Sequence, residues 1–167
     1  MSKVLYVDYD RCNGCELCAL HCSFAKTGTF NPRRSRVQVI GWEEKGLFVP
    51  ALCQHCANPP CAPACPESAI IKDGKTGTVS IDYATCKDRF SCIPACPYGA
   101  ITIDPATKRV IQCDLCGGDP VCAKVCPIGV IQFVEEEKLP VKREAYLEKY
   151  GETLASMPGR VVKEGSR

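Results

Sequence analysis

The 167-residue chain lacks several features that would assign it to a common functional class. No stretch approaches the ~18 apolar residues that a membrane-spanning helix requires. Residues 1–10 have no apolar segment of the kind that a secretory signal carries. There is no GxGxxG run, no phosphate-binding loop and no pairing of a nucleophile with a base. We therefore expect a cytoplasmic protein that inserts into no membrane and has no catalytic site of its own.

The chain also has little excess of basic over acidic residues, with 21 against 19. The formal net charge is +2, and the one basic cluster, Arg33, Arg34 and Arg36, has no aromatic residues between its members. Surfaces that bind nucleic acid combine clustered basic residues with recognisable motifs or stacking aromatics. We therefore expect no nucleic-acid partner, and we interpret the cluster as a solvated loop, with docking of a partner protein as the alternative.

Cysteine, in contrast, is abundant, with 15 residues. Such a content is typical of disulfide scaffolds, zinc modules or iron–sulfur proteins. Every cysteine falls in one of four motifs, which we number I to IV: CNGCELCALHC from residue 12, CQHCANPPCAPACP from 53, CKDRFSCIPACP from 86 and CDLCGGDPVCAKVCP from 113. These runs are variants of the ferredoxin pattern C-x2-C-x2-C-x3-C-P. Their repetition favours iron–sulfur clusters over zinc, and the odd count with no secretory signal argues against disulfides.

The spacing between motifs predicts how they pair. Motifs II and III are separated by 20 residues and motifs I and II by 30, so II and III look like a two-cluster ferredoxin inserted into another formed by I and IV. Over about residues 3–134 the chain resembles the four-cluster, ferredoxin-like electron-transfer subunits of molybdenum and tungsten oxidoreductases. Within that family, the segment TGTFNPRRSRVQV looks similar to the small subunit of tungsten-dependent aldehyde oxidoreductases.

The resemblance implies four cluster sites, each completed by a cysteine of the paired motif. Three would hold [4Fe–4S] clusters, and the fourth would be short of one thiolate. The implied ligands are Cys12, Cys15, Cys18 and Cys126 at site one; Cys22, Cys113, Cys116 and Cys122 at site two; Cys53, Cys56, Cys61 and Cys96 at site three; and Cys65, Cys86 and Cys92 at site four.

Site four is the anomaly, because Arg89 stands where motif III should have its second cysteine. A guanidinium has no lone pair to offer iron. Three outcomes remain open: a [3Fe–4S] cluster, a [4Fe–4S] cluster completed by the Asp88 carboxylate or by water, or an empty site. His21 and His55 also lie inside motifs, but the cysteines there are complete, so we expect hydrogen bonding or packing from them.

The fold expected is α+β, with tandem nested ferredoxin-like domains and a helical tail. Residues 1–49 and 98–134 would form the outer domain, and residues 50–97 the inserted one. Alternating patterns predict a strand over 3–8 and hairpins over 36–52, 69–82 and 100–112. In the tail, residues 135–167, Leu147, Tyr150, Leu154 and Met157 predict an amphipathic helix over about 141–156. We interpret it as docking onto a partner or a second copy, the alternative being packing on its own domain.

The function expected is transfer of single electrons along a row of clusters. The resemblance implies a pterin-type catalytic subunit on one side and a flavin subunit or ferredoxin on the other. Carbon monoxide dehydrogenase, formate dehydrogenase or hydrogenase are the alternative complexes, and a free-standing polyferredoxin is the alternative without one.

Overall fold

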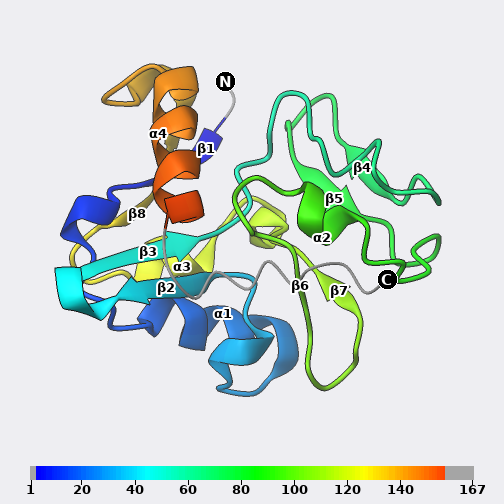
Figure 1. Cartoon of the computed structure of the whole chain (residues 1–167), viewed down its shortest axis with the longest axis horizontal. Helices are drawn as coiled ribbons and strands as arrows, with labels where there is room; N and C mark the ends of the chain where they lie inside the picture. The colour runs from blue at the N-terminus through cyan, green and yellow to red at the C-terminus, as the bar shows by residue number, and fades with distance from the viewer. Residues whose placement is uncertain (1–2, 157–167) are drawn as a thin grey trace.

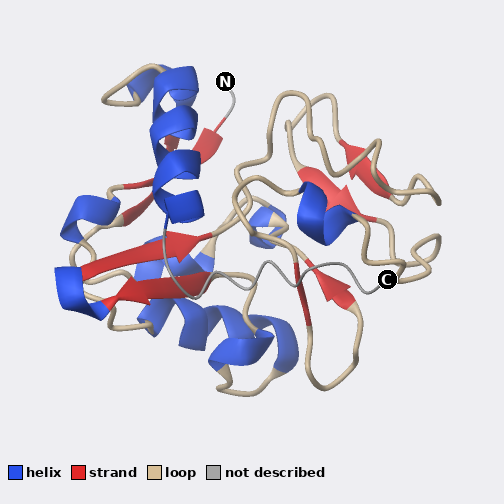
Figure 2. Cartoon of the chain, in the orientation of Figure 1, coloured by secondary structure: helices blue, strands red, loops and turns tan. Residues whose placement is uncertain are grey.

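The computed structural model describes residues 3–156 and has the predicted α+β architecture (Figures 1 and 2). Within those residues the strands form four separate two-stranded antiparallel sheets. Sheets of this size bury little apolar surface alone. The interior must therefore come from what packs between them.

One sheet joins the two ends of the chain's ferredoxin-like part. Strand β1 (Lys3–Val7) pairs with β8 (Ile131–Glu135), so that Lys3 lies opposite Glu135 and Val7 opposite Ile131. The first strand was predicted from the sequence and its partner was not. All four cysteine motifs lie between these two strands in sequence, which produces a nested arrangement.

The other three sheets are the predicted hairpins. Strand β2 (Gln38–Trp42) pairs with β3 (Leu47–Ala51), β4 (Ile70–Lys72) with β5 (Val79–Ile81), and β6 (Thr102–Ile103) with β7 (Val110–Ile111). In the β2–β3 connection Gly46 takes a left-handed conformation with φ of 60°, which glycine adopts at no steric cost.

The residue that comes after the last cysteine of a motif determines how long the helix at that cysteine can be. Helices α2 (Cys92–Ala95) and α3 (Val121–Val125) are short, because Cys96 and Cys126 precede prolines and the residue before proline disfavours the helical region. Motif I has Ser23 in that place, so α1 (Leu17–Thr27) continues and ends at Gly28. The last helix is α4 (Arg143–Ser156).

Two groups of buried residues form the interior. The large core gathers residues of β1, β3, β8 and α4, among them Leu5, Val49, Ile131 and Leu154. The small core consists of Cys61, Ile70, Val79, Cys92, Ile101 and Val110. Hairpin β6–β7 thus contributes Val110 to the core of the inserted motifs, although the predicted division at residue 97/98 assigns it to the outer domain.

Helix α4 packs on its own domain, the arrangement that the sequence analysis gave as the alternative to docking. It stands against β1 and β8 of its own chain (Figure 1), and its buried side chains are Tyr146, Tyr150 and Leu154. The Tyr150 hydroxyl donates to the Pro50 carbonyl, and the Tyr146 hydroxyl accepts from the Val7 amide at 3.3 Å. The body has a larger apolar surface than the sequence indicated, and the helix covers it. Met157 and the rest of the tail lie outside the described residues.

The expected solvated loop also differs from the structure at one residue. Arg34 forms a two-point ion pair with Asp104, with Nε–Oδ1 and Nη2–Oδ2 distances of 3.0 and 2.9 Å. The Asp104 side chain is only 6% exposed. The pair ties the segment before β2 to hairpin β6–β7, so Arg34 links the outer part of the chain to the inner one.

Candidate iron–sulfur sites

Three cavities are lined by the cysteine sets that the sequence analysis grouped. Each is a hollow partly open to solvent, with about 300–320 Å³ of space between atoms when the open part is included. In every case the last cysteine of one motif joins cysteines of its paired motif. The sets are Cys12, Cys15, Cys18 and Cys126 for site one; Cys53, Cys56, Cys61 and Cys96 for site three; and Cys65, Cys86 and Cys92 for site four.

The cysteines of site two are also brought together. Three of them are buried: Cys22 on α1, Cys122 on α3, and Cys113 in the loop before α3. Burial, followed by the charges of Cys113, Cys22 and Cys116, raises the pKa of Cys122. Cys18 and Cys22 are four residues apart on one helix, so they lie one turn apart on the same face. Helix α1 therefore supplies site one with Cys18 and site two with Cys22.

The Cys-Pro turns provide hydrogen bonds to sulfur. In each of the three turns the amide four residues after the cysteine donates to its Sγ: Ala69 to Cys65 at 3.4 Å, Ala100 to Cys96 at 3.4 Å and Val130 to Cys126 at 3.2 Å. Proline has no N–H and its ring prevents the helix from continuing, which turns the chain back over the sulfur. Such bonds stabilise a thiolate.

All four motifs share one backbone feature. The third residue of each, immediately before the second cysteine position, has positive φ: 72° at Gly14, 44° at His55, 51° at Asp88 and 55° at Leu115. Three of these are not glycine, and such residues rarely adopt this conformation. Motif III keeps it although Arg89 has replaced cysteine. Its loop is therefore folded as a cluster loop.

Burial has a consistent effect on the thiols. Desolvation raises the pKa of Cys18 and Cys113 to about 12, and that of Cys61 and Cys92 to about 11. A buried thiol is hard to ionise without a nearby positive charge, and iron supplies that charge when it replaces the protons.

The donor set fits iron–sulfur clusters. At three sites, four thiols surround a cavity or a common interior, and at the fourth there are three. Within residues 3–156, no three His, Cys, Asp or Glu side chains converge tightly enough for a single metal ion. Sulfurs that surround a space, with amides directed at them, suit a cluster with its own sulfides.

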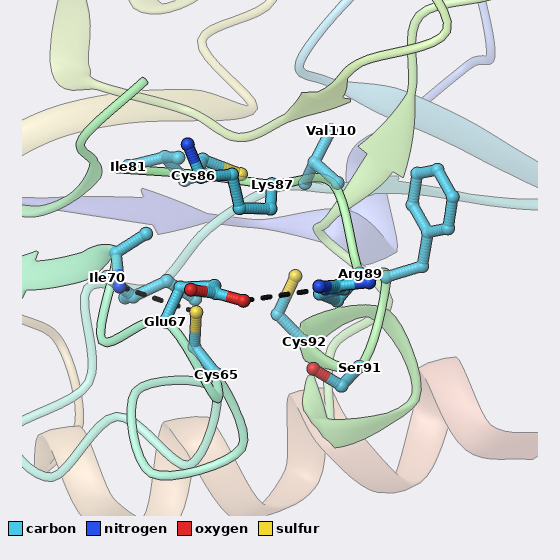
Figure 3. A pocket seen from close by; sticks show the side chains of 12 residues that line it. Cys65, Glu67, Ile70, Ile81, Cys86, Lys87, Arg89, Ser91, Cys92 and Val110 are labelled. Atoms are coloured by element: carbon cyan, nitrogen blue, oxygen red, sulfur yellow. Dashed lines mark hydrogen bonds and ion pairs between the residues drawn. The ribbon is translucent and has the colours of Figure 1, made fainter. Parts of the chain in front are cut away.

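Site four differs from the others in the side chains near its open corner (Figure 3). Arg89 and Glu67 both line the cavity, and an ion pair with an Nε–Oε1 distance of 3.4 Å joins them. Asp88 is not among the lining residues. Its Oδ1 accepts from the Val110 amide at 2.8 Å and from the Cys86 thiol at 3.8 Å, and its Oδ2 accepts from Arg109 Nε at 3.1 Å.

The two histidines have the roles expected of non-ligands. His55 Nδ1 accepts from the Val79 amide at 2.9 Å, and burial lowers the pKa of this histidine to about 4, so the ring is neutral. His21 packs edge-on against the Phe30 ring.

Sequence reasoning missed two residues at these sites. Gln112 is 4% exposed, and its Nε2 donates to Cys53 Sγ and to the Val79 carbonyl, both at 3.1 Å. It immediately precedes Cys113, so one residue contacts site three and adjoins site two. No local pattern marks it. Glu67, the other residue, could have been found by comparing the residue after each Cys-Pro pair.

Comparison with known proteins agrees with this geometry. The family model described as the 4Fe-4S dicluster domain matches residues 44–136. The NADH-dependent phenylglyoxylate dehydrogenase subunit beta of Aromatoleum evansii is 40% identical over 129 residues, covering 76% of this chain and 29% of that one. The chain belongs to the 4Fe-4S dicluster domain family.

Other relatives have similar names. The polyferredoxin-like subunit of the aliphatic sulfonate oxidoreductase of Pyrococcus furiosus is 41% identical, over 70% of this chain and 67% of its own length. Formate dehydrogenase 2 subunit beta of Nitratidesulfovibrio vulgaris is 31% identical, over 83% and 79%. A solved structure, the BamBC complex of benzoyl coenzyme A reductase with benzoyl-CoA, includes a chain that is 26% identical over 88% of this one, with a TM-score of 0.47.

Across residues 3–156, no helix combines the length and the apolar character that crossing a membrane requires.

Proposed function

We propose that this chain is the iron–sulfur electron-transfer subunit of an oxidoreductase complex, relaying single electrons along a row of four clusters. The observation that carries the proposal is that 11 of the 15 cysteines line three cavities, each of which combines cysteines of two motifs. When bound, clusters of this kind each carry one electron. The chain's part is to hold the sites in order, bury them and donate hydrogen bonds to their sulfurs.

Electrostatic interactions between thiols of neighbouring sites support the order of the row. Beyond burial and the other thiols of site two, the charge of Cys18 from site one raises the pKa of Cys122. After burial, the charge of Cys113 from site two is the next cause of the raised pKa of Cys53 in site three. The charge of Cys61 from site three contributes in the same way to the pKa of Cys92 in site four. The order is therefore one, two, three, four.

The step between sites two and three is where the nested halves meet. Gln112 spans it, because its side chain contacts Cys53 Sγ while its backbone continues into Cys113. A through-bond and hydrogen-bond path thus connects the two halves within a buried region. We propose three [4Fe–4S] clusters at sites one to three and a fourth cluster at site four, because the site-four cavity and loop have the same form as the others.

For the complex, we propose a tungsten- or molybdenum-pterin aldehyde oxidoreductase subunit as the electron donor, and a flavin subunit or ferredoxin as the acceptor. One support is the resemblance of the segment TGTFNPRRSRVQV to the small subunit of tungsten-dependent aldehyde oxidoreductases. The other is that relatives of this chain are named as subunits of oxidoreductases. The relative named as a formate dehydrogenase subunit favours that complex as the second candidate.

Anaerobic purification of the tagged chain with its bound partners tests both levels of the proposal. We expect about 15 or 16 iron atoms per chain, with tungsten or molybdenum in the co-purified subunit. Aldehyde should reduce the clusters, whereas formate should not. A colourless chain containing zinc would overturn the electron-transfer function. Reduction by formate alone would replace the aldehyde partner and leave the function standing.

A matched pair of variants tests the row itself. Cys116→Ser removes one ligand from site two, and Cys86→Ser removes one from site four at the end. Substrate-dependent reduction of the sites beyond site two should be lost in the first variant and kept in the second when electrons enter at site one. Equal loss in both variants would contradict the order of the row.

A further inference from the structure

The open corner of site four has its own geometry. The cavity there is about 320 Å³, equal to that of site one, although it has three cysteines instead of four. Motif III also repeats the backbone of motif I on both sides of the second position: φ is 51° and 63° at Asp88 and Phe90, against 72° and 57° at Gly14 and Glu16. Arg89 therefore occupies the place of Cys15 in a loop with the same backbone form.

Asp88, the carboxylate nearest in sequence, is held by partners on hairpin β6–β7. Its Oδ1 accepts from the Val110 amide at 2.8 Å and from the Cys86 thiol at 3.8 Å, and its Oδ2 accepts from Arg109 Nε at 3.1 Å. The Cys86 proton is lost when the thiolate binds iron, and the other two hydrogen bonds remain. Its backbone takes the same place as Gly14, and aspartate tolerates that left-handed conformation better than most residues. Asp88 thus holds the loop against hairpin β6–β7 and does not line the cavity.

Glu67 lines the cavity from the opposite side, on the loop that supplies Cys65 (Figure 3). It follows a Cys-Pro pair, and the same position lines the cavity at two other sites. There the residue is Ile128 at site one and Tyr98 at site three. At sites one and three, which have four cysteines each, the residue at this position has no carboxylate. At site four, which lacks a cysteine, the residue at this position is a glutamate.

The ion pair of Glu67 is weak enough to exchange. Arg89 is 65% exposed and Glu67 32% exposed, with an Nε–Oε1 distance of 3.4 Å. Exposed pairs of this kind contribute ~0–1 kcal/mol. No other hydrogen bond of the Glu67 carboxylate is among those found in residues 3–156. The carboxylate can therefore turn from Arg89 to an iron at little cost.

We propose that Glu67 is the ligand of the fourth iron at site four, and that this iron can be taken up and released. The inference rests on the proposed function in one respect, namely that site four holds a cluster. In uptake, a reduced [3Fe–4S]⁰ cluster and one Fe²⁺ give [4Fe–4S]²⁺. One iron–oxygen bond to Glu67 forms, the Glu67–Arg89 ion pair breaks, and no electron is transferred. An oxidised three-iron cluster first takes one electron from an added low-potential reductant such as dithionite.

The test uses the holoprotein and four variants: Glu67→Gln, Asp88→Asn, Arg89→Cys and Glu16→Gln. Glu16 is the matched control, because it lines the cavity of site one, which has its four cysteines. Each protein is treated with ferricyanide and a chelator, then with dithionite and isotopically labelled Fe²⁺. The readouts are the EPR signal of the oxidised three-iron cluster and the labelled iron bound per chain, measured by Mössbauer spectroscopy.

We expect the wild type, Asp88→Asn and Glu16→Gln to show the three-iron signal after chelation and to take up about one labelled iron. Glu67→Gln should keep the three-iron signal, with affinity for the added iron at least ~10-fold lower, as for lost metal-site contacts. Arg89→Cys should show no three-iron signal at any stage, because a thiolate then holds the fourth iron.

Three results would overturn the proposal. Loss of uptake in Asp88→Asn with normal uptake in Glu67→Gln would assign the iron to Asp88. Normal uptake in both would assign it to water. A wild type that never gives the three-iron signal would show that the iron is not released. Failure of the proposed function is distinguishable, because an empty site four would leave about 12 irons per chain before any treatment.

Discussion

The outer and inner parts of the chain use the same cysteine motifs but have different interiors. The large core combines strands β1, β3 and β8 with the aromatic side chains of α4, and cysteines are a minority of its residues. The small core has six buried residues, of which Cys61 and Cys92 are themselves candidate ligands. An interior this small supplies little stability without a staple. The comparison indicates that the clusters stabilise the inner part more than the outer part.

Removing iron should produce the largest difference in stability between the inner and outer parts. After anaerobic chelation, we expect amides of β4–β7 to lose nearly all protection from hydrogen exchange, because metal-binding free energy is also folding free energy. Amides of β1, β8 and α4 should keep part of theirs. Mass spectrometry of exchanged peptides measures both regions in one sample. Equal loss in the two regions would show that the large core has no stability of its own.

Shortening one buried side chain of α4 tests the large core. Tyr150 is fully buried, and its ring packs against Tyr9, Tyr98 and Tyr146. Tyr150→Ala should lower the free energy of unfolding by about 3–5 kcal/mol, as large-to-small aromatic changes do. The exposed Glu152→Ala on the same helix should change it by less than about 0.5 kcal/mol.

Anaerobic denaturant unfolding, followed by tyrosine fluorescence, measures the effect of this truncation. The EPR signals of site four should be unchanged in Tyr150→Ala before unfolding begins. Loss of those signals in the folded variant would contradict the separation of the two interiors.

Gln112 lies where the two parts meet. Gln112→Leu should change the reduction potential of site three more than the free energy of unfolding of the chain. A hydrogen bond to a charged group contributes about 1.5 kcal/mol, and its loss from the Cys53 thiolate disfavours the more negative, reduced state. The bond is present in both oxidation states, and only its strengthening on reduction shifts the potential. We therefore expect the potential of site three to fall by at most about 59 mV, which is a tenfold change for one electron. Redox titration followed by EPR measures the shift. Gln132→Leu, whose Nε2 donates to the Gly129 carbonyl, is the control and should leave site three unchanged.

The sequence predicted the cysteine motifs and the hairpins because both depend on local spacing. Cys-Pro ends a helix wherever it stands, and alternation around a turn such as Gly46 is read from neighbouring residues. Pairing of β8 with β1 and burial of α4 depend on residues more than 100 positions apart. The places of Glu67 and Gln112 likewise depend on how two motifs fold together. Such contacts leave no periodic pattern in a single sequence.

The smallest effect should come from the ion pair between the parts. Arg34, chiefly through its hydrogen bonds, lowers the pKa of Asp104 from 3.8 to about 2. The carboxylate therefore stabilises the fold fully above its ordinary pKa, and the contribution is lost as pH falls from 3.8 towards 2. Asp104→Asn should lose visible cluster absorbance a few-fold faster than wild type after a jump to pH 5, with rates converging near pH 2. Asp119→Asn, at an exposed pair with Lys124, is the control. A constant ratio of rates across this range would show that Asp104 acts through packing and not through its charge.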